Sequence, residues 1–336
     1  MGRARLPVGR RMIRLSVALC TYNGRPYIAE QLASILDQQP GVAQLVVSDD
    51  GSLDGTLDVV RNALASRTGL PDVVILEGET PAGVTANFER AITATDGELV
   101  ALSDQDDRWH VDRVRTIGAR FDAEKDLTLL HTDATLVKAS GAPLGRTLFE
   151  SLEVSPAEFA AEESGDAFRA LLRRNLATGA TVVFRRELLA QALPLPREWV
   201  HDEWLAIIAA ATGTVGVLRE PTIDYRLHGA NQIGVAEPTL RYKLRRVLER
   251  RGDRNAVLAA RFAVLAERLA ALGDAVAPQD LAAARAKAAF EAERAALPAN
   301  RLRRIRPVLA LRRRGLYPAY ASRGRADVLR DLLQPA

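Results

Sequence analysis

Short apolar runs alternate with amphipathic segments over the first hundred residues, and no other feature constrains the fold as strongly. The apolar runs have the length of buried strands and occupy residues 15–20, 45–52, 73–76 and 98–103. The segments between them place apolar residues on one helical face and occupy residues 26–38, 53–65 and 84–95. Strands separated by helices of about 10–13 residues predict right-handed βαβ units and a parallel sheet. The chain is therefore expected to begin as an α/β domain.

Beyond this region the pattern becomes mixed and then helical. Strands are expected at 127–137 and 180–186, and helices at 166–174, 202–211 and 280–297. After Pro238 the chain is rich in Arg and Ala, and spacings of four and three there indicate a coiled-coil-like seam of Leu258, Phe262, Leu265, Leu269 and Leu272. We predict three parts: a flexible tail at 1–13, an α/β domain at 14–236 and a basic helical region at 237–336.

Charge divides the chain at the same place. Residues 1–236 carry 24 Lys or Arg and 32 Asp or Glu, whereas residues 237–336 carry 22 and 10, so the two parts are expected to meet different partners. The single cysteine, Cys20, excludes an intramolecular disulfide and a Cys-based zinc site, and it favours a reducing, cytoplasmic compartment. No apolar run in the sequence reaches the roughly 18–20 residues that cross a bilayer.

Polar residues follow three of the predicted strands. Thr21-Tyr22-Asn23 follows the first, Asp49-Asp50-Gly51-Ser52 ends the second, and Asp104 to Asp107 follows the fourth. Ligands of an open parallel sheet bind outside the carboxyl ends of its strands, so these residues are candidates for one site. The alternative is that they only form turns and helix caps, which favour the same residue types.

Asp104 and Asp106 are candidates for a metal site. In an extended backbone, residues two apart point to the same side, so both carboxylates can face one point. Carboxylate pairs suit Mg²⁺ or Mn²⁺ and leave positions open for water and phosphate. The alternative is a solvated acidic loop in which Asp107 caps a helix that starts near Trp109.

Four segments together resemble family 2 glycosyltransferases, and within them a rhamnosyltransferase-like branch: CTYNGRPYIAEQLASIL, VSDDGSLDGT, GELVALSDQDDRW and HDEW. The likeness covers about residues 14–234 in the correct order. The resemblance implies a GT-A fold, which is a Rossmann-like, mostly parallel sheet flanked by helices, here with a C-terminal helical extension. It also implies that this domain binds a nucleotide diphosphate sugar.

The resemblance implies roles for the residues at the strand ends. Tyr22 would lie beside the base and Asp50 would accept a hydrogen bond from the pyrimidine imide, with Thr21, Asn23 and Gly51 in the same nucleotide pocket. Asp104 would approach the ribose or the metal, and Asp106 would be the direct ligand of Mn²⁺ or Mg²⁺. His228 is either a third metal ligand or a structural histidine.

The catalytic base implied by the resemblance is Asp202, which would deprotonate the acceptor hydroxyl in a single displacement that inverts the anomeric carbon. The alternatives are that Asp202 is an ordinary helix N-cap or that Glu203 is the base. Arg226 would meet phosphate or pair with an acid. The donor and acceptor pocket is expected to contain Asn87, Gln105, Trp109, Asn175, Thr178, Gly179, His201, Glu203, Trp204 and Arg226.

Three interpretations apply to the basic region 237–336. Its arginine clusters can lie on an anionic membrane, which would suit a lipid-linked acceptor. They can instead belong to a helical extension that packs on the catalytic domain or forms a homodimer through the Leu258–Leu272 seam. Nucleic acid is not expected as a partner, because the region has no aromatic interleaving and no known binding motif.

The resemblance thus implies an inverting, metal-dependent glycosyltransferase that moves rhamnose from dTDP-rhamnose to a saccharide or lipid-linked saccharide in surface polysaccharide synthesis. It is expected in the cytoplasm, or peripherally at the inner face of the plasma membrane. A UDP-sugar donor is the first alternative. A nucleotidyltransferase is less favoured, because residues 14–30 contain no glycine-rich phosphate loop. A non-catalytic nucleotide-sugar-binding or scaffold protein would not need Asp202.

Overall fold

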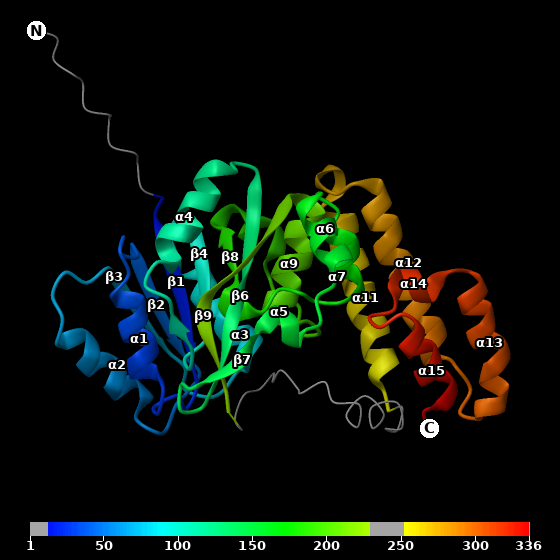
Figure 1. Cartoon of the computed structure of the whole chain (residues 1–336), viewed down its shortest axis with the longest axis horizontal. Coiled ribbons are helices and arrows are strands. Elements are labelled where there is room, and N and C mark those ends of the chain that lie inside the picture. Colours follow the sequence, from blue (N-terminus) through cyan, green and yellow to red (C-terminus); the bar gives the residue numbers. More distant parts are fainter. Residues whose placement is uncertain (1–12, 229–251, 336) are drawn as a thin grey trace, which may run out of the picture.

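Four parallel strands alternate with helices at the start of the chain, as the apolar runs predict (Figure 1). The computed structural model describes residues 13–228 and 252–335. The strands are β1 (Leu15–Thr21), β2 (Gln44–Asp49), β3 (Asp72–Glu77) and β4 (Leu99–Ser103), and the helices are α1 (Ile28–Leu36), α2 (Thr56–Ala65) and α3 (Val84–Thr93). Because β1 lies between β2 and β4, the polar segments that follow these three strands meet at one edge of the sheet.

The second part of the sheet is mixed in direction. Its strands are β5 (Arg108–Trp109), β6 (Leu127–Lys138), β7 (Pro143–Thr147), β8 (Val183–Arg185) and β9 (Thr214–Leu227). The sheet has the order β3-β2-β1-β4-β8-β6-β9-β5, and β7 pairs with β6. Strand β8 is antiparallel to both β4 and β6, whereas β9 is parallel to β6. The short β5 pairs with β9, which brings the end of β9 beside the loop that follows β4.

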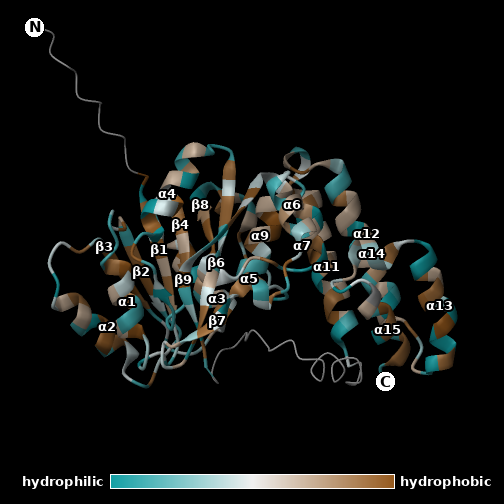
Figure 2. Ribbon diagram, in the orientation of Figure 1, coloured by the Kyte–Doolittle hydropathy of each residue, from teal (hydrophilic) through white to brown (hydrophobic). Residues whose placement is uncertain are grey.

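Helices cover both faces of this sheet. They are α4 (Arg113–Ala123), α5 (Leu148–Ser151), α6 (Pro156–Glu163), α7 (Ala167–Arg173), α8 (Leu189–Ala192) and α9 (His201–Thr212). Side chains alternate between the two faces of a strand, and β1 accordingly sends Ala18 and Cys20 into one apolar cluster and Val17 and Leu19 into another. Figure 2 shows the hydrophobic residues concentrated along the central strands. This architecture confirms the predicted α/β class.

Five α-helices follow within residues 252–335 of the C-terminal region, and the first two pack against the sheet domain. The five are α11 (Arg254–Ala271), α12 (Pro278–Ala295), α13 (Arg301–Arg313), α14 (Leu316–Tyr320) and α15 (Arg325–Leu333). Phe262 and Leu265 of α11 belong to the same buried cluster as Phe168 and Trp204 of the α/β domain. The predicted boundary at 236/237 and the predicted tail, apart from residue 13, lie outside the described residues.

Two expectations for the basic region need correction. The seam residues Phe262, Leu265 and Leu269 are buried within the chain's own core, so this seam is not available as a dimer contact. Arg304, from one of the predicted basic clusters, is fully buried and donates hydrogen bonds to the carbonyl oxygens of Ala299 and Gln334, both at 2.8 Å. It therefore cannot lie on a membrane. Within residues 13–228 and 252–335, no helix has the length and apolar character that spanning a bilayer demands.

Candidate active site

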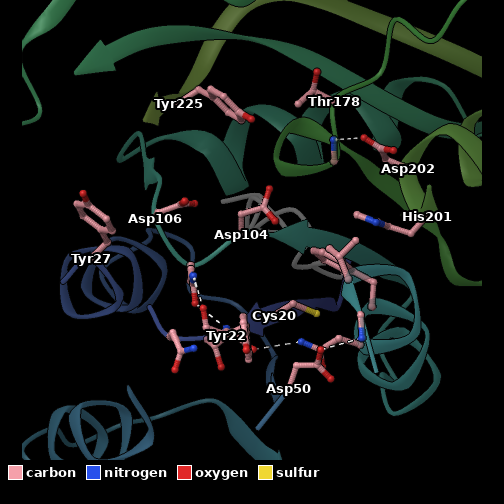
Figure 3. Close-up of a pocket in the computed structure, with 18 of the residues that line it drawn as sticks. Cys20, Tyr22, Tyr27, Asp50, Asp104, Asp106, Thr178, His201, Asp202 and Tyr225 are labelled. Atoms are coloured by element: carbon pink, nitrogen blue, oxygen red, sulfur yellow. Dashed lines mark hydrogen bonds between the residues drawn. The ribbon is translucent and has the colours of Figure 1, made fainter. Parts of the chain in front are cut away.

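A cavity of about 850 Å³ lies where the polar segments after β1, β2 and β4 meet. Fifteen of the residues that the sequence predicts for a site line it: Thr21, Tyr22, Asn23, Asp50, Asn87, Asp104, Gln105, Asp106, Asn175, Thr178, Gly179, His201, Asp202, Glu203 and His228. Figure 3 shows Asp104 and Asp106 facing an open space that Tyr225, Asp202 and His201 border on its other sides. The volume is that of a small-molecule site.

The turn after β1 is tied to the loop after β4. Gln105 accepts a hydrogen bond from the Tyr22 backbone N–H (2.8 Å) and donates one to the Tyr22 carbonyl (3.0 Å). A side chain at Gly24 would place its Cβ 2.0 Å from Gln105 Oε1, so only glycine permits this contact. Gln105 therefore positions Tyr22, a residue that is 42% exposed and lines the cavity.

The two acids at the end of β2 organise the neighbouring loops. Asp49 accepts hydrogen bonds from the Thr21 and Ser52 hydroxyls, each at 2.6 Å, and closes the turn after β2. Asp50 accepts backbone hydrogen bonds from Ala82 and Gly83, both at 2.9 Å, and so fixes the loop before α3. Asp50 thus reaches the cavity with a carboxylate whose orientation is already set.

Asn87 is a second support beneath the cavity. Its amide donates to the Ser48 carbonyl (3.0 Å) and to the Thr21 carbonyl (3.3 Å), and its oxygen accepts from the Ser48 hydroxyl (2.7 Å). These bonds join α3 to β1 and β2. Asn87 lines the cavity, as expected, while most of its hydrogen-bonding capacity holds the two strands together.

The acidic loop after β4 gathers negative charge inside the cavity. Burial and the charges of Asp106 and Asp202 raise the pKa of Asp104 to about 8. Asp106 contacts His228, with 2.7 Å between Oδ2 and the imidazole Nε2. His228 in turn stacks on Tyr27 at 4.8 Å between ring centroids. His228, expected to be either a third metal ligand or a structural histidine, thus lies beside the acidic loop.

The three predicted metal ligands do not form a preassembled cluster. Among the described residues, no group of three or more His, Cys, Asp or Glu side chains is arranged to hold one ion. His228 and Asp106 instead bond to each other. The expectation of a complete three-ligand site is therefore corrected to an acidic pair, Asp104 and Asp106, which still needs oxygen atoms from a ligand or water to complete a coordination shell.

Arg226 holds the acidic loop from outside the cavity. Its guanidinium donates to the carbonyl oxygens of Asp106 (2.7 Å) and Ala139 (2.9 Å), and it pairs with Glu30 (2.6 Å). Its backbone N–H donates to the buried Asp107 (3.0 Å), whose pKa is raised well above its ordinary value, chiefly by burial. Arg226 does not line the cavity, so the expected phosphate contact is wrong and the expected pairing with an acid is confirmed.

Asp202 lies in the first turn of α9, across the cavity from the acidic loop. The N-cap of α9 is Val200, so the interpretation of Asp202 as that cap is wrong. Its Oδ2 accepts from the Gly179 backbone N–H (2.8 Å) and its Oδ1 from that of Glu203 (2.6 Å). Burial, followed by the charge of Glu203, raises the pKa of Asp202 to about 7. A carboxylate with that pKa is suited to general base chemistry near neutral pH.

His201 is a neutral imidazole at the cavity wall. Its ring stacks on Phe88 with 3.8 Å between centroids, and neither ring nitrogen has a hydrogen-bond partner among the described residues. Burial lowers the pKa of His201 to about 3. A Cβ at Gly179 would lie 3.0 Å from His201 Nε2, so glycine at this position leaves room for the imidazole ring.

Three other predicted residues lie elsewhere. Gly51 forms the turn after β2 with φ of 83° and does not reach the cavity. Trp109 is buried in the core, with the Arg113 guanidinium 4.6 Å above its ring. Trp204 is fully buried and donates to the Ala192 carbonyl at 2.8 Å. The expected contacts of the two tryptophans with a sugar are therefore wrong, because both side chains point into apolar clusters.

Some cavity residues were missed in the sequence. They are mostly apolar or aromatic: Cys20, Pro26, Tyr27, Pro81, Val84, Phe88, Leu152 and Tyr225. Tyr27 follows the polar turn after β1, and Tyr225 precedes Arg226 in β9, so closeness to recognised motifs was an available signal for both. Leu152 lies between helices α5 and α6 and has no such signal.

The chain matches the family model described as Glycosyl transferase family 2 over residues 16–189. This match covers more than half of the chain, and the protein belongs to that family. It is similar to the dTDP-rhamnosyl transferase RfbG of Shigella flexneri, with 26% identity over 226 residues, which cover 64% of this chain and 73% of RfbG. Four relatives have matches that span more than 60% of this chain, and these matches span 59% to 79% of the relatives' own length.

Solved structures of two glycosyltransferases share the fold. TarS of S. aureus, crystallised with UDP-GlcNAc, matches with a TM-score of 0.57 and 18% identity, covering 96% of this chain and 90% of that one. The mannosyltransferase PcManGT of Pyrobaculum calidifontis, in complex with GDP-Man and Mn²⁺, matches with a TM-score of 0.52 and 19% identity, covering 98% and 89%. These likenesses confirm the GT-A fold and include the C-terminal helices.

Proposed function

We propose that this protein is an inverting glycosyltransferase that moves rhamnose from dTDP-rhamnose to a saccharide or lipid-linked saccharide acceptor in surface polysaccharide synthesis. The observation that carries the reaction type is the position of Asp202. It shares one cavity with the acidic pair Asp104 and Asp106, and its raised pKa suits it to accept a proton. The name of RfbG, a dTDP-rhamnosyl transferase, supports the donor.

The acidic pair fits a divalent cation. Asp104 and Asp106 bring two carboxylates to a cavity in which burial and like charge oppose the ionisation of Asp104, and a cation would relieve that repulsion. Mn²⁺ or Mg²⁺ held there would offset the negative charge of a diphosphate leaving group. The complex of PcManGT with GDP-Man and Mn²⁺ supports this assignment.

The chain's own residues would then act on opposite sides of the sugar. Tyr22 and Asp50 would contact the base, because they line the cavity at the end formed by β1 and β2. Asp202 would take the proton of the acceptor hydroxyl, held in place by the Gly179 and Glu203 amides. His201, whose ring nitrogens have no hydrogen-bond partner among the described residues, would offer one nitrogen to a sugar hydroxyl.

A UDP-sugar is the second candidate donor, and the complex of TarS with UDP-GlcNAc favours it. Thymine and uracil differ by one methyl group and share the imide that Asp50 would contact. A thermal-shift screen of dTDP-rhamnose, dTDP-glucose, UDP-GlcNAc, UDP-glucose and GDP-mannose, with and without Mn²⁺, separates the candidates. We expect the largest Mn²⁺-dependent stabilisation from dTDP-rhamnose; stabilisation by none of these donors would contradict a nucleotide-sugar enzyme.

We also propose that the catalytic unit spans residues 14–236 and that the basic region 237–336 places it at an anionic membrane surface. Helix α13 supports this, because Leu302 is 77% and Ile305 is 43% exposed beside the exposed Arg301, Arg303 and Arg306. Sedimentation with phosphatidylglycerol vesicles is expected to remove the protein from solution at 20 mM but not at 500 mM salt, since salt screens this attraction. No sedimentation at low salt would contradict the placement.

A further inference from the structure

A second, smaller cleft of about 160 Å³ adjoins the active-site cavity. It lies where α7 and the start of α9 face helices α11 and α12 (Figure 1). Asn175 and Glu203 line both spaces, so the cleft opens on the Asp202 side of the active site. The acidic pair Asp104 and Asp106 lines only the larger cavity.

Basic side chains dominate the lining of this cleft. It contains five of them, Arg173, Arg174, Arg254, Arg261 and Lys287, against two acidic ones, Glu203 and Glu291. The formal excess is three positive charges. The larger cavity shows the opposite balance, because Asp50, Asp104, Asp106, Asp202 and Glu203 line it and no Arg or Lys does so.

Internal ion pairs account for three of the five cations. Arg174 binds Glu158 through two hydrogen bonds of 2.7 and 2.8 Å. Lys287 pairs with Glu291 at 2.7 Å, and Arg261 pairs with Glu203. These pairs hold the wall of the cleft in place, so a ligand would meet a largely preformed surface.

Arg173 takes part in none of these ion pairs. Its guanidinium makes no hydrogen bond or ion pair with the part of the chain that the structure describes, and its buried Nε has no partner. The buried Nε of Arg261, on the other side of the cleft, also lacks one. A buried donor without a partner is costly, and an oxyanion with several oxygen atoms can satisfy two guanidinium groups together.

We propose that this cleft binds a phosphate group of the acceptor and thereby sets its hydroxyl beside Asp202. The proposal rests on the proposed function, which places the donor diphosphate at Asp104 and Asp106 and leaves the Asp202 side for the acceptor. Phosphate is favoured over carboxylate because it carries up to two charges and can bind two planar guanidinium groups at once. The acceptor is then a phosphorylated saccharide, a polyol phosphate or a lipid diphosphate.

The test is a calorimetric titration of the full chain, first with dTDP or UDP and Mn²⁺ and then with inorganic phosphate at constant ionic strength. Nucleotide binding reports on the proposed function, and saturating nucleotide blocks the diphosphate position. We expect phosphate to bind this complex and Arg173→Gln to weaken it at least tenfold, with nucleotide affinity unchanged. Arg169→Gln, on the same helix and paired outside the cleft with Asp280, should change neither affinity.

Equal phosphate affinity in wild type and Arg173→Gln, or no phosphate binding by wild type, would overturn the proposal while nucleotide binding still stands. If neither nucleotide binds, the proposed function fails. The phosphate affinities of wild type and Arg173→Gln, measured without nucleotide, then still show whether the cleft binds phosphate. Arg173→Lys, which keeps the charge, should recover part of the affinity and so separates loss of charge from misfolding. Acetate binding tighter than phosphate would overturn the phosphate assignment. Glycerol 3-phosphate and geranyl diphosphate distinguish a polyol phosphate from a lipid diphosphate. Whichever of the two binds more tightly identifies the source of the phosphate group.

Discussion

Asp202→Asn is expected to abolish transfer and, at alkaline pH, to remove a cost to folding that the wild-type carboxylate imposes. Burial and Glu203 raise the pKa of Asp202 from 3.8 to about 7, so the folded protein binds this proton more tightly than the unfolded chain does. Below about pH 3 the group is protonated in both states and costs nothing. As the pH rises toward 7 the unfolded chain ionises first, and the folded state loses stability relative to it.

The magnitude follows from that difference. At about 1.36 kcal/mol for each pH unit, a pKa raised from 3.8 to about 7 destabilises the folded state by about 4 kcal/mol at high pH, of which about 3 kcal/mol develops between pH 4.5 and pH 8. The asparagine has one carbonyl oxygen for the two amides that Asp202 binds, so the variant also loses one hydrogen bond. That loss, about 1 kcal/mol, does not depend on pH and cancels in the comparison.

Urea unfolding of wild type and Asp202→Asn at pH 4.5 and pH 8 measures this quantity. The free energy of unfolding of the variant should rise relative to wild type by about 3 kcal/mol between the two pH values. Asp58→Asn, which changes a side chain that is 79% exposed on α2, is the matched control and should show no such trend. If the free energies of unfolding of wild type and Asp202→Asn differ by the same amount at both pH values, the argument that Asp202 has a raised pKa is refuted. Undiminished turnover of the variant would refute the assignment of Asp202 as the base.

Three further predictions concern the same cavity. Because deprotonated Asp202 is the proposed active form, kcat/KM should rise about tenfold from pH 6 to pH 8, and a profile that falls over this range would contradict its role. Gly24→Ala forces a methyl group against Gln105 and should lower the free energy of unfolding by about 1–3 kcal/mol, whereas Gly118→Ala, in α4 with nothing within 4 Å of the added methyl, should be neutral or stabilising in the same urea assay. Arg226→Lys keeps the charge but loses the planar fork that holds the acidic loop, so calorimetry should show Mn²⁺-dependent nucleotide binding weakened by about tenfold; unchanged affinity would show that the loop holds itself.

The local pattern of the first hundred residues was enough to predict the parallel part of the sheet. The expected strand at 15–20 is β1 (Leu15–Thr21), and the expected helix at 84–95 is α3 (Val84–Thr93). Strand β9 was missed, since Arg219, Glu220 and Pro221 interrupt its apolar alternation and the pairing register with β6 shifts nearby. The helix expected near Trp109 begins instead at Arg113, because the short β5 takes up residues 108–109.

The site, like the fold, contains some features that the local sequence predicts and others that only tertiary packing determines. Residues directly after β1, β2 and β4 were predicted to meet, because carboxyl ends of neighbouring parallel strands share an edge. Trp109 and Trp204 were misplaced because short-range motifs do not reveal which way a side chain points. The second cleft was not foreseen at all, since it brings Arg173 of α7 together with Arg261 of α11, which lie far apart in the sequence.

By itself, the sequence determined the fold class, the family and the acids that gather at one edge of the sheet. Each of these depends on periodicity or on residues close together along the chain. Only the tertiary structure decided the pKa of Asp202, the bond between His228 and Asp106 and the burial of Arg304 among helices expected to be exposed. These properties depend on which distant groups exclude water from a side chain, and long-range packing alone determines that.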